Sequence, residues 1–261
     1  MKFNLKTGAL VVLMVGVSAV GIAADKVYDI STAAFVSPVA SYGVDGVSET
    51  WGFEAGEGFA PGFIGGQAGW TAFAASVAEG HIDTANPHAG SQHLRISNDP
   101  AVAAGTLLGA FSPLVADPIV DASSVSVYVA IGDVGGADYD VVPQSPTQGL
   151  LTARVKFDFE GNIQVLDDVG AGLVFVDTGA DWVPITYNLL EIYVDPVGNT
   201  IDYWYGGSLI YSSVVGVVAA TIIEQVVLLS DNFNAGESGD FDDLVIDRGD
   251  VPVELQSLSL D

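Results

Sequence analysis

Apolar and polar positions alternate with a period of two along most of the chain after residue 24, without a sustained period of 3.6. Residues 124–131 place their apolar members on one side of an extended chain: Val125, Val127, Val129 and Ile131. Successive side chains of a strand point to opposite faces, so this pattern predicts strands with one buried face.

Residues 151–160 repeat the alternation. The apolar members are expected to face the core: Val155, Phe157 and Phe159. The charged members are expected to face water: Arg154, Lys156, Asp158 and Glu160. The pair Gly161-Asn162 then predicts a hairpin turn into a strand over 163–166.

Residues 182–212 predict a meander of antiparallel strands. In order, they contain a strand over 190–195, a turn over 196–199, a strand over 201–205, the Gly206-Gly207 turn and a strand over 208–211. Further strand candidates are residues 49–54, 69–76, 93–97, 106–111, 173–177, 222–230 and 241–247. Residues 132–149 combine acids, prolines and glycines and predict one long surface loop.

The succession of short strands and Gly, Asn, Asp and Pro turns predicts an all-β protein, either an antiparallel sandwich or a barrel. No repeat of fixed period is present, so we expect one domain over residues 45–248. It follows an N-terminal extension over residues 25–44 and precedes a C-terminal tail over 249–261.

Residues 1–24 have the layout of a cleavable signal peptide. Lys2 and Lys6 precede an apolar stretch over 8–22, and Ala23-Ala24 follow it. The alternative is an uncleaved anchor, but the stretch is shorter than the roughly 20 residues that span a bilayer. The sequence therefore predicts a secreted protein, extracellular, at the cell surface or in the periplasm, with no membrane span after cleavage.

The charge and the cysteine content exclude some classes of binding partner and metal site. The chain has 33 acidic and 7 basic residues, and loss of Lys2 and Lys6 with the leader changes its formal charge from −26 to −28. This balance excludes nucleic acid, whose binding depends on Lys and Arg at phosphates, and favours divalent cations. The absence of cysteine excludes disulfides and thiolate metal sites.

Three stretches carry a family resemblance: Trp51-Gly52-Phe53-Glu54 with residues 63–70; residues 181–182, 190–195 and 199–207 of the central hairpin; and residues 231–234 with 239–247. They resemble the opening strand, central hairpin and closing strand of the concanavalin A-like lectin/glucanase superfamily, including its laminin G-like domains in secreted bacterial proteins. The resemblance implies a two-sheet β-sandwich of jelly-roll form, in which the first and last strands are neighbours.

Catalytic patterns are missing from the sequence. Glycanases of this superfamily carry Glu-x-Asp-x-x-Glu on one strand, which this chain lacks, and Glu49 and Glu54 are five positions apart and so face opposite sides. There is also no Gly-x-Ser-x-Gly nucleophile elbow. We therefore expect a protein that is not an enzyme.

Two metal sites can be drawn from the sequence. His81, His88 and His93 lie near Asp83, although isolated histidines near turns are more often surface residues. The resemblance implies a structural calcium between the first and last strands, which would use Glu54 with Asp242 or Asp243. Alternation points Asp242 and Asp243 to opposite faces, so only one of them is expected at a shared site; an ordinary solvated acidic loop is the alternative.

The aromatic residues of the central hairpin are candidates for ligand binding, because sugars stack on exposed rings. They are Trp182, Tyr193, Tyr203, Trp204 and Tyr205. Tyr203 and Tyr205 share one face of their strand and Trp204 takes the other. The alternative is that these rings pack in the core, as we expect for Trp51 and Trp70.

These observations favour a secreted, non-catalytic lectin-like domain that binds glycan or another extracellular surface ligand, with calcium as a cofactor. A second hypothesis is a self-associating structural component of an extracellular matrix, surface layer or filament, which suits an acidic, cysteine-free β domain. A glycoside hydrolase or lyase is the third hypothesis.

Overall fold

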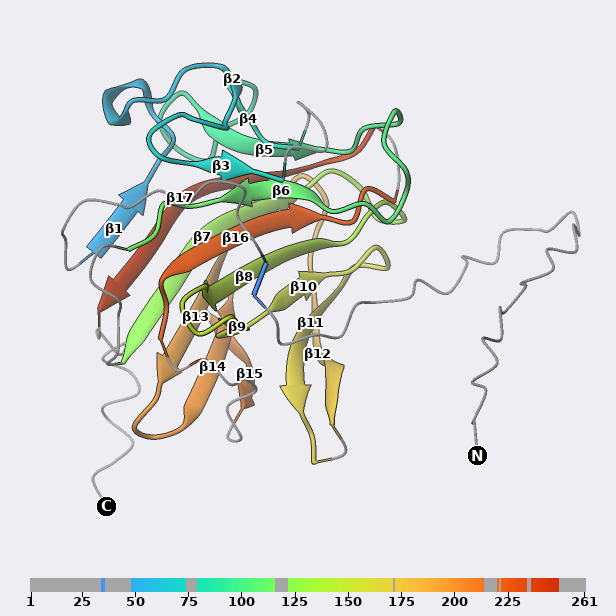
Figure 1. The fold of residues 1–261 in the computed structure, drawn as a ribbon. Helices are drawn as coiled ribbons and strands as arrows, with labels where there is room; N and C mark the ends of the chain where they lie inside the picture. The colour runs from blue at the N-terminus through green and yellow to red at the C-terminus, as the bar shows by residue number, and fades with distance from the viewer. Residues whose placement is uncertain are drawn as a thin grey trace, which may run out of the picture.

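The computed structural model describes residues 34–35, 48–73, 79–115, 122–170, 172–213, 220, 222–233 and 236–248. They form two antiparallel sheets of nine and eight strands that pack as a sandwich (Figure 1). The predicted all-β, two-sheet class is therefore confirmed. The predicted signal peptide and C-terminal tail lie outside the described residues.

The nine-stranded sheet has this order: β15 (Ser208–Ser213), β14 (Thr200–Tyr205), β13 (Asn188–Asp195), β7 (Ser123–Ile131), β17 (Ser238–Arg248), β5 (His93–Ser97), β4 (His81–Asp83) and β2 (Gly62–Phe63). β1 (Ser48–Trp51) also pairs with β17. The first and last strands are thus neighbours, as the family resemblance implied.

The eight-stranded sheet has this order: β12 (Leu173–Asp181), β11 (Asn162–Asp168), β10 (Val155–Phe157), β8 (Tyr139–Ser145), β16 (Gln225–Ser230), β6 (Leu108–Phe111) and β3 (Thr71–Ala72). β9 (Leu150–Leu151) pairs with β8, and a short 3₁₀ helix, η1 (Ala55–Glu57), follows β1.

The core lies between the sheets and comes from the alternation seen in the sequence. Val125, Val127 and Val129 of β7 are buried, as predicted, while the residues between them are half-buried. The predicted meander is also confirmed as β13, β14 and β15. Gly206 and Gly207 both have positive φ, which a two-residue hairpin turn requires.

The N-terminal end of the domain is anchored by packed rings. Trp51 and Trp70 meet edge to face at 5.7 Å, and Phe53 contacts Trp70 at 5.2 Å. All three side chains are buried, so the prediction that Trp51 and Trp70 belong to the core is confirmed. This packing fixes the start of the chain segment that carries Glu54.

The prediction of a long surface loop over residues 132–149 is wrong, because β8 is a central strand of the eight-stranded sheet. All residues of β8 are buried, so the strand shows no alternation. Pro143 lies at a bulge: its carbonyl accepts hydrogen bonds from both Thr152 N (2.9 Å) and Ala153 N (3.3 Å). A bulge tolerates the missing N–H of proline inside a sheet.

The prediction that Arg154, Lys156 and Asp158 face water is also wrong. Their exposed fractions are 7%, 1% and 2%. Arg154 and Lys156 do point away from the core, as the alternation requires, but the outer face of the eight-stranded sheet is itself covered. Arg154 is compensated there by an ion pair with Asp140, and Glu160 is exposed as expected.

Candidate functional site

The outer face of the nine-stranded sheet gathers polar and aromatic side chains. Arg95, Tyr128 and Asp242 alternate with core residues of β5, β7 and β17, so they point away from the core. The connection between β4 and β5 lies against this face, because His88 stacks on Tyr128 with ring centroids 3.5 Å apart. We call His88, Tyr128, Asp242 and Asp243 the His88 cluster.

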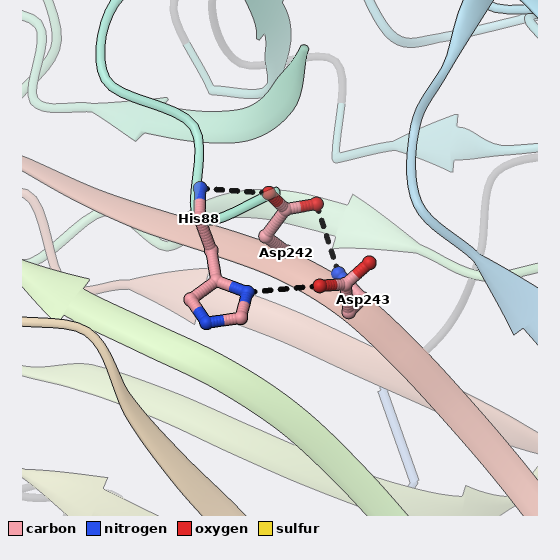
Figure 2. A group of neighbouring side chains, drawn as sticks. All are labelled: His88, Asp242 and Asp243. Atoms are coloured by element: carbon pink, nitrogen blue, oxygen red, sulfur yellow. Dashed lines mark hydrogen bonds and ion pairs between the residues drawn. The ribbon is translucent and has the colours of Figure 1, made fainter. Parts of the chain in front are cut away.

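A β-bulge in β17 brings two consecutive carboxylates together. The pairing with β7 shifts between Asp242 and Val245, and Asp243 has a left-handed φ of 50°. The expectation that Asp242 and Asp243 point to opposite faces is wrong, because the bulge interrupts the alternation. One ligand atom from each of His88, Asp242 and Asp243 lies within 4.8 Å of the others, and no other described group of three does so (Figure 2).

Asp242 anchors the β4–β5 connection. Its Oδ2 accepts hydrogen bonds from the backbone N–H groups of His88 (2.9 Å) and Ala89 (3.1 Å), and its Oδ1 accepts one from Asp243 N (2.9 Å). Burial raises the pKa of Asp242 to about 6, and the nearby charge of Asp243 adds to the shift, although these hydrogen bonds oppose it.

His88 is exposed but held on several sides. Its Nδ1 lies 2.9 Å from Asp243 Oδ2, and its ring meets Tyr187 edge to face at 5.5 Å. Figure 2 shows the Asp242 carboxylate at the backbone of His88 and the Asp243 carboxylate at its ring. The imidazole therefore has a defined orientation on the surface.

Glu54 lies next to this cluster and is not one of its three potential ligands. Its Oε1 accepts hydrogen bonds from Ser91 N (2.6 Å) and Gln92 N (3.0 Å), and its Oε2 accepts one from Ser91 Oγ (2.7 Å). The backbone hydrogen bond from Ser91 lowers the pKa of Glu54, although burial acts in the opposite direction. Glu54 and Asp242 thus hold the two ends of the segment 88–92.

Two carboxylates approach Gly52, those of Glu57 and Asp243. A Cβ placed on Gly52 would lie 3.4 Å from Asp243 Oδ1, 3.5 Å from Glu57 Oε1 and 3.9 Å from Glu54 Cγ. Glu57 is held there by Gly52 N (3.2 Å) and Glu54 N (3.3 Å). The two oxygens nearest this position, Glu57 Oε1 and Asp243 Oδ1, are of the kind that calcium prefers, whereas the Glu54 carboxylate is turned toward Ser91.

The other two histidines belong to a separate ion-pair network. Arg95 donates to both carboxylate oxygens of Asp240, through Nε (2.7 Å) and Nη2 (2.9 Å), and also pairs with Asp83. His93 is fully buried, with Nε2 3.3 Å from Asp240 Oδ1, and His81 lies 3.8 Å from Asp83. The structure therefore separates His88 from His81 and His93.

The five predicted ligand-binding rings divide between the two sides of the sheet. Trp182, Tyr203 and Tyr205 are buried in the core, and Trp182 Nε1 donates to Asp158 O (3.0 Å). Tyr193 and Trp204 are half-buried on the outer face. The predicted alternation of residues 203–205 is confirmed, and only Tyr193 and Trp204 of the five are accessible to a ligand; their binding role stays a prediction.

Sequence reasoning missed Tyr128, Tyr187 and Glu57 as neighbours of the acidic site, and treated His88 as a plain surface residue. The spacing of Glu57 three positions after Glu54 was a usable signal, because the side chain reaches back to the backbone N–H of Glu54. Tyr128 carried no local signal, since its position beside Asp242 depends on the pairing of β7 with β17.

No protein-family model matches the chain, and no curated protein is similar to it at a significant level. Among solved structures, one called Sialidase covers 74% of this chain with a TM-score of 0.53 and 10% identity; the match spans 19% of that chain's length. Apo Crh5 transglycosylase covers 82% with a TM-score of 0.47 and 10% identity, over 90% of its own chain. The Caenorhabditis elegans galectin LEC-6 covers 59% with a TM-score of 0.37 and 9% identity, over 96% of its own chain.

Similarities at this level of identity concern the fold alone. The chain has a two-sheet antiparallel sandwich fold, and its membership of the concanavalin A-like superfamily stays a prediction, as does its place in the laminin G-like branch. Among the described residues, no helix has the length and apolar character needed to cross a membrane.

Proposed function

We propose that the mature chain is an exported, non-catalytic lectin-like domain that binds glycan, or another ligand of an extracellular surface, on the outer face of the nine-stranded sheet. The observation that carries this proposal is the pair of half-buried rings, Tyr193 and Trp204, on that face. The lack of the glycanase carboxylate pattern in the sequence supports a binding role.

Carboxylates flank both rings. In the register of β13 and β14, Glu191 lies opposite Trp204, and Tyr193 lies opposite Asp202. Tyr193 donates its hydroxyl hydrogen to Glu191 Oε1 (2.8 Å), which orients both groups. A sugar can stack its C–H face on such a ring and donate its hydroxyl hydrogens to the carboxylates.

A glycan array with the purified mature chain tests this function. We expect Trp204→Ala and Tyr193→Ala each to weaken binding by about tenfold, the effect of losing roughly 1.4 kcal/mol of stacking. Phe233→Ala is the matched control, because this ring is 42% exposed but lies in the β16–β17 connection. The proposal is wrong if the wild-type chain binds no glycan, or if all three variants lose the same amount of glycan affinity.

Calcium at the junction of the first and last strands forms part of the proposal. Glu57 and Asp243 would hold it, because one carboxylate oxygen of each approaches Gly52 and retains lone pairs, and Glu54 is the neighbouring carboxylate that the family resemblance implies. Bound calcium would neutralise these charges and link the segment 52–57 to β17. His88 does not suit calcium, because its ligand atom is an imidazole nitrogen, and the Asp242 carboxylate is fully buried against the backbone of His88 and Ala89.

Thermal unfolding with calcium, magnesium or sodium chloride at matched ionic strength tests this site. We expect calcium to raise the Tm of the wild-type chain above the value in the other salts, since a ligand that binds only the folded state stabilises it. Asp243→Asn is expected to remove the calcium-specific shift, and Asp195→Asn, an acid at a distant turn, to retain it. Identical Tm values in all three salts would exclude the site.

A second candidate function, a structural component that assembles, rests on the sheet edges. β15 and β12 are terminal strands of the two sheets, and Leu209 on β15 is 48% exposed. Terminal strands present unpaired backbone groups that another copy can use. Electron microscopy of the mature chain separates the two functions. Assembly is favoured if the wild-type chain forms ordered polymers, Leu209→Lys prevents them, and the wild-type chain has no affinity for glycan.

A further inference from the structure

The outer face of the eight-stranded sheet is buried like a core. In a two-layer sandwich this face normally meets solvent, yet a second apolar cluster on it has exposed fractions of 0–1%. Its fully buried members are Phe111, Val142, Leu151, Leu166, Val227 and Leu229. The proposed glycan site is on the outer face of the other sheet, so the two faces are independent of each other.

Two residues that precede the domain in sequence lie on this face, far in sequence from the strands they contact. Ala34 and Phe35 form the short blue segment beside β8 and β10 in Figure 1, and Ala34 N donates to Gly149 O (3.0 Å). Phe35 packs against the apolar cluster. Ala34 and Phe35 therefore cover part of this face.

Gln144 of β8 holds the backbone of Phe35 at two points. Its Oε1 accepts from Phe35 N (2.8 Å), and its Nε2 donates to Phe35 O (3.1 Å). The same Nε2 donates to Gln225 Oε1 (2.8 Å), and Gln225 Nε2 donates to Ser112 O (2.7 Å), so the amide of Gln144 is fixed in orientation. A neighbouring β-strand would offer the same pair of groups to an extended peptide.

The ring of Phe35 has its own contacts. It meets Phe73 edge to face at 6.0 Å, and the guanidinium carbon of Arg154 lies 5.7 Å from its centroid. Arg154 also lies 5.1 Å from the ring centroid of Phe175 and is held in place by Asp140. A planar cation between two rings favours an aromatic side chain at this position.

We infer that the outer face of the eight-stranded sheet is an acceptor site for an extended peptide that carries an aromatic residue, and that the resident segment, Ala34-Phe35 of the same chain, occupies it. The site binds the peptide through its backbone at Gln144 and through one ring beside Arg154. Backbone recognition is independent of sequence, so specificity comes from the ring. An added peptide of this kind competes with the resident segment.

Fluorescence anisotropy tests the inference with full-length mature chains. The probe is a labelled peptide of residues 29–41, and its matched control is the same peptide with Phe35→Ala. A chain carrying Phe35→Ala is expected to bind the probe about tenfold or more tightly than the wild-type chain, because the resident segment no longer occupies the site. The control peptide is expected not to bind. Equal binding by both chains, or of both peptides, would overturn the inference.

Hydrogen exchange on the wild-type chain provides a second test that needs no variant. The amides of Ala34 and Phe35 are expected to be protected, and an excess of the unlabelled probe peptide to accelerate their exchange. Unprotected amides would contradict the docking. Sedimentation shows which copy of the chain supplies the segment. If the wild-type chain is a dimer and Phe35→Ala is a monomer, the occupant comes from a second copy. That result would overturn its assignment to the same chain.

Discussion

At the scale of single residues, Asp242 makes the fold sensitive to pH. Its pKa is raised from the ordinary 3.8 to about 6, so the folded chain retains this proton at pH values where the unfolded chain loses it. Ionisation of Asp242 therefore destabilises the fold as the pH rises from about 4 to 6, and the loss is complete above that window.

The first prediction compares the wild-type chain with Asp242→Asn in the presence of chelator. As the pH falls from 6 to 4, the wild-type chain is expected to gain stability relative to Asp242→Asn. The reason is that Asp242 takes up a proton in this window, whereas the asparagine cannot. Urea unfolding at several pH values measures it. A difference that is constant over this window would contradict the raised pKa.

Glu54 has the opposite dependence. Its pKa is lowered by hydrogen bonds from Ser91, so it contributes stability above its ordinary value of 4.5 and loses that contribution as the pH falls through the lower, folded value. Glu54→Gln is thus expected to lower the urea midpoint at neutral pH, and its effect is expected to shrink at low pH, once the acid is protonated in both states. Both chains are unfolded in the presence of a chelator. If Glu54→Gln lowers the urea midpoint equally at neutral and at low pH, the charge of Glu54 is not the cause of its effect on stability.

At the scale of elements, β6 and β16 pair closely at Gly109. A Cβ there would lie 2.2 Å from Leu228 O and 2.8 Å from Leu229 Cα, both backbone atoms. Gly109→Ala is therefore expected to destabilise the chain by about 1–3 kcal/mol or more, as overpacking does. Gly56→Ala is the matched control, since nothing lies within 4 Å of its added Cβ. Urea unfolding measures both, and equal stabilities would contradict the close approach.

The Arg154–Asp140 pair joins the loop before β10 to β8 within the covered face. Arg154 Nε donates to Asp140 Oδ2 (2.6 Å), and both residues are buried. Arg154→Met leaves the carboxylate without this cation and is expected to cost about 3–5 kcal/mol. Adding Asp140→Asn is expected to recover part of that loss. A double-mutant cycle by urea unfolding measures the coupling, and additive losses would show that the two groups act independently.

At the scale of the whole molecule, the charge of −26 opposes compaction. The Debye length falls from about 30 Å at 0.01 M salt to about 8 Å at 0.15 M, so salt screens the repulsion between acidic side chains. The Tm is expected to rise between these two sodium chloride concentrations. Calorimetry in the presence of chelator measures it, and a Tm that falls with salt would show that attractive ion pairs dominate instead.

Much of the fold could be predicted because alternation and turn chemistry are local. Val125, Val127 and Val129 indicate the buried side of β7, and Gly206-Gly207 marks the turn between β14 and β15. The candidate calcium site could be predicted in part from the sequence. The family resemblance pointed to Glu54 and Asp243, and both lie beside Gly52. His88 gave no comparable signal, because its orientation depends on Tyr128 of a distant strand.

By itself, the sequence determined the all-β class, the strands of the nine-stranded sheet that have one solvent-facing side, and the acidic character of the chain. Only the tertiary structure decided that β8 is a central strand, that Arg154 and Lys156 are buried, and that Asp242 and Asp243 share one side. The physical reason is common to all three. Burial of both faces, and the position of a bulge, depend on segments that are far apart in sequence, and a periodic pattern records only one face of one strand.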